Sequence, residues 1–139
     1  MRGQKALLAT TLVLLLLGAG AWGCGPAPTP TPPVDQVISC EEARAHIGEF
    51  KTVQGVFYAS YRPDVRGEPT FLNCPVPYPN HDFTALIWGD ERSVFQSCLG
   101  GAPEVVLDNR EVRVSGLIEP YEGKPEIILT GCHQLEVIR

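Results

Sequence analysis

Cysteines are the residues of this chain whose type and spacing most restrict its chemistry. Four of them, Cys40, Cys74, Cys98 and Cys132, are separated by 34, 24 and 34 positions. Zinc sites usually contain close cysteine pairs, and thioredoxin-like redox motifs need two neighbouring cysteines, so this spacing disfavours both. An even number of well-separated cysteines in a small domain is instead typical of disulfides formed in an oxidising compartment. We expect two structural disulfides and no metal.

Three pairings of these cysteines are possible, and the sequence alone does not choose among them. We favour Cys40 with Cys132 and Cys74 with Cys98, because the first pair joins the two ends of the domain, which often lie close together. In the chain-entropy model the short Cys74–Cys98 loop contributes roughly 3.5 kcal/mol and the long Cys40–Cys132 loop roughly 4.6 kcal/mol, each taken singly. Either value is a large part of the ~5–15 kcal/mol that stabilises a small domain.

The fifth cysteine, Cys24, follows a segment with the layout of an export signal. Arg2 and Lys5 give a positive start, residues 7–17 form an apolar run, and residues 18–23 are mostly small. The apolar run is too short to be read first as a membrane-spanning helix. The segment resembles a bacterial lipoprotein signal, which implies lipidation of Cys24, export, and attachment to the outer side of the cytoplasmic membrane or to a further membrane. A plain cleaved signal and an uncleaved anchor are the alternatives.

The chain therefore divides into a signal (1–23), a proline-rich linker (24–36) and one domain (37–139). Alternating prolines in the linker favour an extended backbone of ~3.1 Å per residue. After the signal, nine basic and 16 acidic residues remain, a net charge of −7. Because nonspecific nucleic-acid affinity comes largely from Lys and Arg, this charge disfavours tight binding to DNA and to anionic lipid.

Runs of β-branched, aromatic and alternating apolar residues predict strands at 51–61, 70–73, 83–88, 111–118 and 126–130, with a short closing strand at 135–138. Gly55 suggests a bulge or coil within the first strand. A helix is expected from Ser39 to Gly48, with Ser39 and Glu42 as a capping box. A second short helix is expected at 91–98, capped by Asp90 and ended by Gly100.

This order of elements predicts a mainly β domain, a five-stranded OB-fold-like Greek-key barrel with an N-terminal helix and a short helix between strands 3 and 4. Another small barrel or a disulfide-tied sandwich are the alternatives. Segments 47–55, 71–73, 78–87 and 112–129 further resemble a family of bacterial exported OB-fold domains, found as stand-alone proteins and as modules of extracellular nucleases. The block 112–129 is the most specific, because strand, turn and strand agree in order and spacing. The resemblance implies a nucleic-acid-binding type of barrel.

In OB-folds, strands 2 and 3 and two loops form the ligand-binding face. The candidate ligand-binding residues in these regions are Tyr58, Tyr61, Arg62, Asn73, Tyr78 and Lys124. Aromatic side chains near arginine suit single-stranded nucleic acid, whose bases stack on them. We expect Phe71 to belong to the core and Tyr121 to pack on the barrel as a turn residue.

No catalytic constellation is visible in the sequence. His81 and Asp82 are adjacent, but neighbouring residues of a strand point to opposite faces, so His81 is interpreted as a loop residue. We therefore expect no catalysis and no cofactor. The predicted function is an exported, lipid-anchored OB-fold binding module, with single-stranded nucleic acid as the ligand that the resemblance implies. The alternative is an envelope structural or interaction lipoprotein that binds a protein or a glycan, and a nuclease accessory is a third hypothesis.

Overall fold

The computed structural model describes residues 23, 25 and 37–138 of the chain. The predicted lipidation site Cys24 lies outside the described residues, as do the predicted signal and linker apart from Gly23 and Gly25. Among the helices of the described part, none has the length and apolar character needed to span a bilayer.

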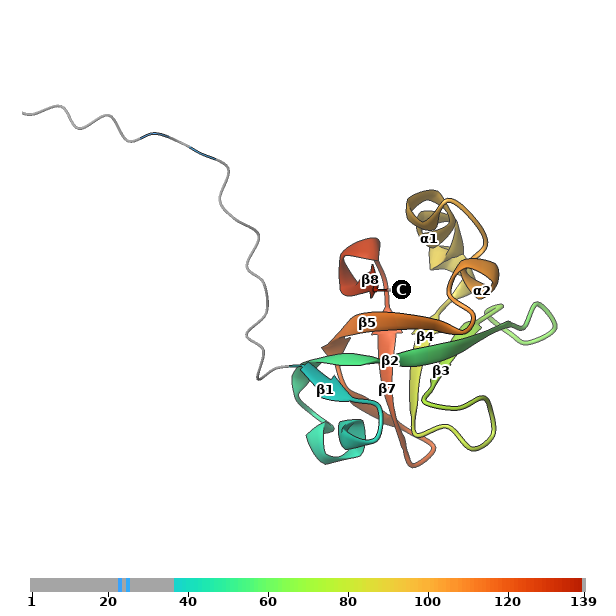
Figure 1. Ribbon diagram of the computed structural model, residues 1–139. Helices are drawn as coiled ribbons and strands as arrows, with labels where there is room; N and C mark the ends of the chain where they lie inside the picture. The colour runs from blue at the N-terminus through green and yellow to red at the C-terminus, as the bar shows by residue number, and fades with distance from the viewer. Residues whose placement is uncertain (1–22, 24, 26–36, 139) are drawn as a thin grey trace, which may run out of the picture. The chain divides into compact units, whose positions relative to one another are not determined.

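Within residues 37–138 the fold is mainly β, and one sheet curls into a half-barrel with two short helices against one end (Figure 1). The strands of this part are β1 (Val37–Ser39), β2 (Phe50–Tyr61), β3 (Thr70–Cys74), β4 (Phe83–Ile87), β5 (Arg110–Leu117), β6 (Glu119–Tyr121), β7 (Lys124–Leu129) and β8 (Leu135–Val137). The helices are α1 (Arg92–Leu99) and α2 (Pro103–Val106), and the 3-10 turns are η2 (Glu42–His46), η3 (Gly89–Glu91) and η4 (Cys132–Gln134).

The long strand β2 organises the sheet. Its first two thirds pair antiparallel with β5, its last third pairs antiparallel with β3, and β1 runs parallel beside it. β4 follows β3 in the sheet, and β7 lies parallel to β4 with Glu126 opposite Thr84. The strand order is β6-β7-β4-β3-β2-β5-β8. The parallel β4–β7 pair joins the β6–β7 hairpin to one end of the sheet.

The mainly β class is confirmed, and so are the six predicted strands, five for the barrel and one short closing strand. The described part, however, has eight strands in all. The two unexpected strands, β1 and β6, are three residues long and lie beside β2 and β7 respectively. Such short strands are specified by the neighbour with which they pair rather than by their own residues, so a local pattern does not predict them.

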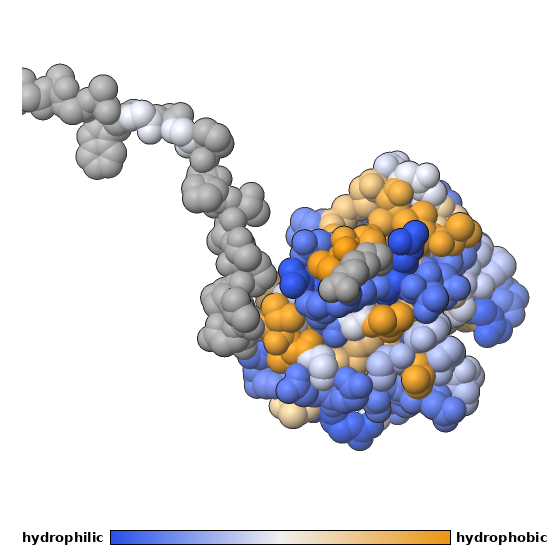
Figure 2. Space-filling model, viewed as in Figure 1, coloured by the Kyte–Doolittle hydropathy of each residue, from blue (hydrophilic) through white to orange (hydrophobic). Residues whose placement is uncertain are grey.

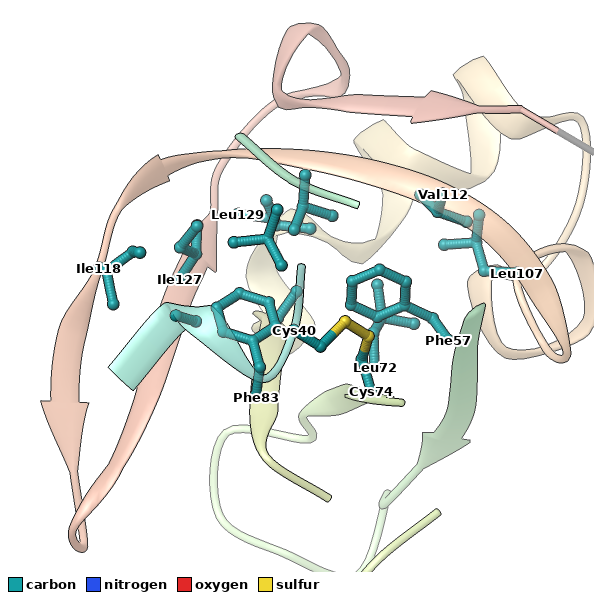
Figure 3. Close-up of a cluster of buried hydrophobic side chains, with 14 of the residues drawn as sticks. Cys40, Phe57, Leu72, Cys74, Phe83, Leu107, Val112, Ile118, Ile127 and Leu129 are labelled. Atoms are coloured by element: carbon teal, nitrogen blue, oxygen red, sulfur yellow. A yellow bond between two sulfur atoms is a disulfide. The ribbon is translucent and has the colours of Figure 1, made fainter. Parts of the chain in front are cut away.

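Buried hydrophobic side chains fill the inside of the curled sheet (Figure 3). Phe57 of β2 and Phe83 of β4 meet edge to face, with ring centroids 6.1 Å apart and planes at 80°. Leu72 and Ile127 are equally buried beside them. Full burial of one such side chain stabilises a fold by about 1.5–3 kcal/mol. Since side chains alternate along a strand, the residues between these core positions point to the opposite face.

The predicted N-terminal helix is only the five-residue 3-10 turn η2. The capping-box contacts are present, since the Ser39 N–H donates to Glu42 Oε2 at 2.7 Å and the Glu42 N–H to Ser39 Oγ at 3.4 Å. However, Ser39 also ends β1, and Gly48 has a φ of 91°. Between these two points the chain forms a 3-10 turn and not an α-helix.

The second predicted helix is confirmed as α1, which Gly100 ends in the left-handed conformation. The 3-10 turn η3, which contains Asp90, precedes it, and the Asp90 side chain makes no capping hydrogen bond to either element. The helix α2 was not expected. Its four residues begin with Pro103, a residue that favours the first turn of a helix because its missing N–H has no partner there in any case.

Two disulfides are present, as expected, but the favoured pairing is wrong. Cys40 pairs with Cys74 and Cys98 with Cys132, at Cα separations of 5.8 and 6.5 Å. β1 and β3 pair with successive stretches of the edge of β2 that lies opposite β5; Cys40 directly follows β1, and Cys74 ends β3. The pairing therefore follows from the ends of β1 and β3, which meet along this edge of β2, and not from the proximity of the two chain ends.

The Cys40–Cys74 disulfide also explains Gly55. A Cβ at this position would lie 2.5 and 2.6 Å from the sulfur atoms of Cys40 and Cys74. The β2–β5 register continues without a break through Gly55, opposite Val112, so the expected bulge is absent. The glycine is required because the sulfur atoms occupy the space that a side chain would need (Figure 3 shows the disulfide among the core side chains).

Candidate ligand-binding groove

A groove of about 850 Å³ lies on the face of the sheet opposite the core. Its floor comes from β2, β3, β4 and β7, and its walls come from the loops that join β2 to β3, β3 to β4, and β6 to β7. Its lining residues include Tyr58, Arg62, Phe71, Asn73, Tyr78, His81, Thr84, Asp108, Tyr121, Glu122, Lys124 and Glu126. The volume is that of an ordinary small-ligand site.

The groove brings together five of the six candidate residues that the sequence analysis selected, namely Tyr58, Arg62, Asn73, Tyr78 and Lys124. Tyr61 is the exception. It is three positions after Tyr58 on β2, an odd spacing that turns it to the other face. There its ring lies 3.7 Å from the guanidinium carbon of Arg92, and its hydroxyl donates to Glu68 Oε2 at 3.1 Å. Tyr61 is therefore part of a packed cluster and not of the groove.

The floor of the groove is polar. Asn73 and Thr84 are both buried, and the Thr84 hydroxyl donates to Asn73 Oδ1 at 3.0 Å. This bond leaves the amide NH₂ of Asn73 without a hydrogen-bond acceptor among the described residues. The floor therefore offers hydrogen-bond donors to a ligand.

Glu126 lies beside Thr84 on the floor, 8% exposed and without a hydrogen-bond partner among the described residues. Burial raises the pKa of Glu126, and the nearby carboxylate of Glu119, opposite it in the β6–β7 pair, raises the pKa further. An ionised carboxylate in this position has no partner within the described residues and little contact with water, and it opens on the groove. A ligand that donates hydrogen bonds would satisfy it.

His81 comes from the β3–β4 loop and is also 8% exposed. Its ring packs near that of Tyr78, with centroids 5.8 Å apart, and its buried Nδ1 has no hydrogen-bond partner in the described structure. Burial lowers the pKa of His81, and the charge of Lys124 lowers it further. His81 is thus neutral at pH 7 and supplies a flat polar ring to the groove wall.

The two cations of the groove are both engaged within the protein. Lys124 Nζ donates to the backbone oxygens of Pro79 and His81 at 2.9 and 2.8 Å, which ties the β6–β7 turn to the β3–β4 loop. Arg62 forms a two-bond pair with Asp64, at 3.1 Å from Nε and 3.0 Å from Nη2. Lys124 fixes the groove walls, whereas Arg62 is held in an exposed ion pair, a kind of contact that contributes little energy.

Several lining residues were missed or misassigned by sequence reasoning. Phe71 is half-buried in the groove rather than part of the core, and Tyr121 is 57% exposed at its rim. Glu126 was not selected, although its position before the buried Ile127 on a predicted strand could have placed it on the outer face. No sequence pattern indicates that the His81 loop folds over the sheet.

Over the described residues, no group of three or more His, Cys, Asp or Glu side chains is arranged to hold a metal ion. The end of the domain that carries the helices differs from the groove in character. Exposed hydrophobic residues gather there, around α1 and α2, including Val94 and Val105 (Figure 2).

Comparison with known proteins gave no match, either to a family model or to a curated protein.

Proposed function

We propose that this chain is an exported, lipid-anchored OB-fold binding module that holds a ligand in the groove without converting it. The OB-fold assignment is supported by the five long strands, which lie side by side in the order β7-β4-β3-β2-β5. Counted along the chain, the fourth of them, β5, pairs with the first, β2, and the fifth, β7, runs parallel to the third, β4. The helices α1 and α2 lie between the third and fourth of these strands. A five-stranded Greek-key barrel with short strands added at its edges would have this order, which supports the proposal.

The location of the groove is the observation that carries the proposal. It lies on β2, β3 and β4, the first three long strands along the chain. It is flanked by the β2–β3 loop and by the β6–β7 turn, which precedes the fifth long strand, β7. These are the regions with which OB-folds bind oligonucleotides and oligosaccharides. The tie from Lys124 to the backbone of Pro79 and His81 holds two of the walls in place before a ligand arrives. Such preorganisation favours affinity because less freedom is lost on binding.

The resemblance to exported OB-fold modules implies single-stranded nucleic acid as the ligand. The exposed rings of Tyr78 and Tyr121 support this candidate, since bases stack on such rings. A glycan or protein of the envelope is the second candidate. It is favoured by the carboxylates of Asp108, Glu122 and Glu126 in the groove and by the engagement of both groove cations.

The proposal is tested by titrating the purified, oxidised protein with two probes, fluorescently labelled (dT)12 and the neutral hexasaccharide chitohexaose. Binding of at least one probe is expected, weakened about tenfold by Tyr78→Ala. Phe50→Ala is the matched control, because Phe50 is 66% exposed, similar to the 76% of Tyr78, but does not line the groove. If neither probe bound, or if Tyr78→Ala left binding unchanged, the groove would not be the ligand site.

A further inference from the structure

We propose that the ligand of the groove is an uncharged oligosaccharide, whose hydroxyl groups hydrogen-bond to Glu126 and Asn73 and whose rings pack on Tyr78 and Tyr121. This inference rests on the proposed function, that the groove is the binding site, and names the class of ligand. Three features of the groove support it: its unpartnered polar floor, its charge and its aromatic rim.

The floor requires hydrogen bonds that the protein does not supply. Glu126 is 8% exposed and Asn73 is 5% exposed, and both line the groove. The Glu126 carboxylate and the Asn73 NH₂ group make no hydrogen bond within the described structure. Leaving such groups without partners is costly, and a hydrogen bond to a charged group is worth about twice a neutral one. Sugar hydroxyls both donate and accept, so an oligosaccharide can hydrogen-bond to Glu126 and to Asn73, which lie on either side of Thr84.

The charge of the groove disfavours a polyanion. Lys124 and Arg62 are engaged with backbone oxygens and with Asp64, so neither is available to bind phosphate without losing these contacts. The carboxylates of Glu122 and Glu126 line the same groove and would repel phosphates. Nucleic-acid affinity comes mainly from cations that neutralise phosphates, and the groove lacks free ones within the described residues.

The rim supplies apolar rings that are open to solvent. Tyr78 is 76% exposed on one wall and Tyr121 is 57% exposed on another. A tyrosine combines a flat apolar face with a polar hydroxyl, and each face of a pyranose ring presents C–H groups bordered by hydroxyls. The two surfaces are complementary, because both are apolar in the centre and polar at the edge.

The position of the groove disfavours an extended peptide. Peptides that add to a sheet bind at an unpaired strand edge, where backbone N–H and C=O groups are free. The groove instead lies on the face of β2, β3, β4 and β7, which are already hydrogen-bonded to one another in that order. A ligand there must be recognised by side chains.

The inference is tested by isothermal titration calorimetry of the purified, oxidised protein with chitohexaose, cellohexaose and (dT)12 at physiological salt. At least one hexasaccharide is expected to bind more tightly than (dT)12. Glu126→Gln and Tyr78→Ala should each weaken sugar binding about tenfold or more. The controls Glu41→Gln and Phe50→Ala, at exposed positions outside the groove, should leave it unchanged.

The outcomes separate the two proposals. If (dT)12 bound with a dependence on Tyr78 and neither sugar did, the oligosaccharide inference would be overturned and the binding function retained. Sugar binding that survived both groove variants would place the sugar elsewhere and also overturn the inference. If none of the three probes bound in a manner that depends on Tyr78, both proposals would fail.

Discussion

Two polar regions on opposite faces of β2 differ in how their charges are satisfied. On the inner side, Arg92 lies over the ring of Tyr61 and donates to Thr70 Oγ1 at 2.8 Å and to Glu104 Oε1 at 2.7 Å. On the outer side, the groove holds Glu126 and His81, equally buried, without hydrogen bonds from their side chains within the described structure. The inner region therefore contributes to stability, whereas the outer one keeps polar groups available for a ligand.

The difference shows why a polar residue near a predicted binding face is weak evidence of function on its own. Tyr61 and Tyr58 are of the same type and three positions apart, yet only Tyr58 reaches the groove. One oxygen of Glu104, Oε2, is itself buried without a partner, but the other is paired with Arg92, which lowers the pKa of Glu104. Glu126 has no cation in this role, and its pKa is raised.

The largest effect on stability is expected for Arg92→Met, which removes the contacts of Arg92 on the inner side of the sheet. Removing the guanidinium leaves Glu104 largely buried without its partner, so the free energy of unfolding should fall by about 2 kcal/mol. Urea unfolding followed by circular dichroism measures this. Arg66→Met, at an exposed position, should change stability by less than about 0.5 kcal/mol. Equal effects of the two variants would show that the Arg92 contacts do not stabilise the fold.

Glu126→Gln tests whether the unpartnered carboxylate in the groove lowers the stability of the fold. Because the pKa of Glu126 is raised in the folded state, its ionised form destabilises the native protein, and the amide should increase stability by about 1 kcal/mol at pH 7. The stabilisation that protonated Glu126 gives the wild type is fully present below the ordinary pKa of 4.5 and is lost as pH rises through the raised folded value.

The advantage of Glu126→Gln over the wild type should therefore appear only above that pH range. Unfolding midpoints measured from pH 4 to pH 8 test this expectation. Of the neighbouring charges, Glu119 raises the pKa of Glu126, so Glu119→Gln should reduce the pH dependence in part. A variant that was less stable than the wild type at pH 7 would contradict the account of an unpartnered carboxylate.

Lys124→Met should have a smaller effect on stability. It removes two hydrogen bonds to the backbone of Pro79 and His81 from a partly exposed site, at a cost of about 1 kcal/mol. The β3–β4 loop should become more mobile, which is measured as faster amide hydrogen exchange at residues 80–82. Unchanged exchange in this loop would show that Lys124 does not hold the groove wall.

Tyr78→Ala should leave stability almost unchanged, within about 0.5 kcal/mol, because the side chain is 76% exposed. Its effect should appear only in ligand binding. A large loss of stability, seen as a lower thermal unfolding midpoint, would mean that Tyr78 supports the His81 loop and belongs with the structural residues.

The sequence predicted the six main strands and helix α1 because their patterns are local: apolar alternation at 111–118 and the glycine that ends α1. It failed where the determinant is a distant partner. The strand β1 exists because β2 lies beside it, and the Cys40–Cys74 disulfide follows from the same arrangement. For the same reason the groove was predicted in outline but without Glu126 and His81, whose roles depend on burial by other segments.

The central claim is that the groove, and not the helix-bearing end of the domain, binds the ligand. The most direct test is a chitohexaose titration of the ¹⁵N-labelled protein, followed through the backbone amide signals. The account predicts concentration-dependent shifts at Asn73, Tyr78, Thr84 and Glu126, with α1 and α2 unaffected. Shifts confined to α1 and α2, around the exposed Val94 and Val105, would contradict it.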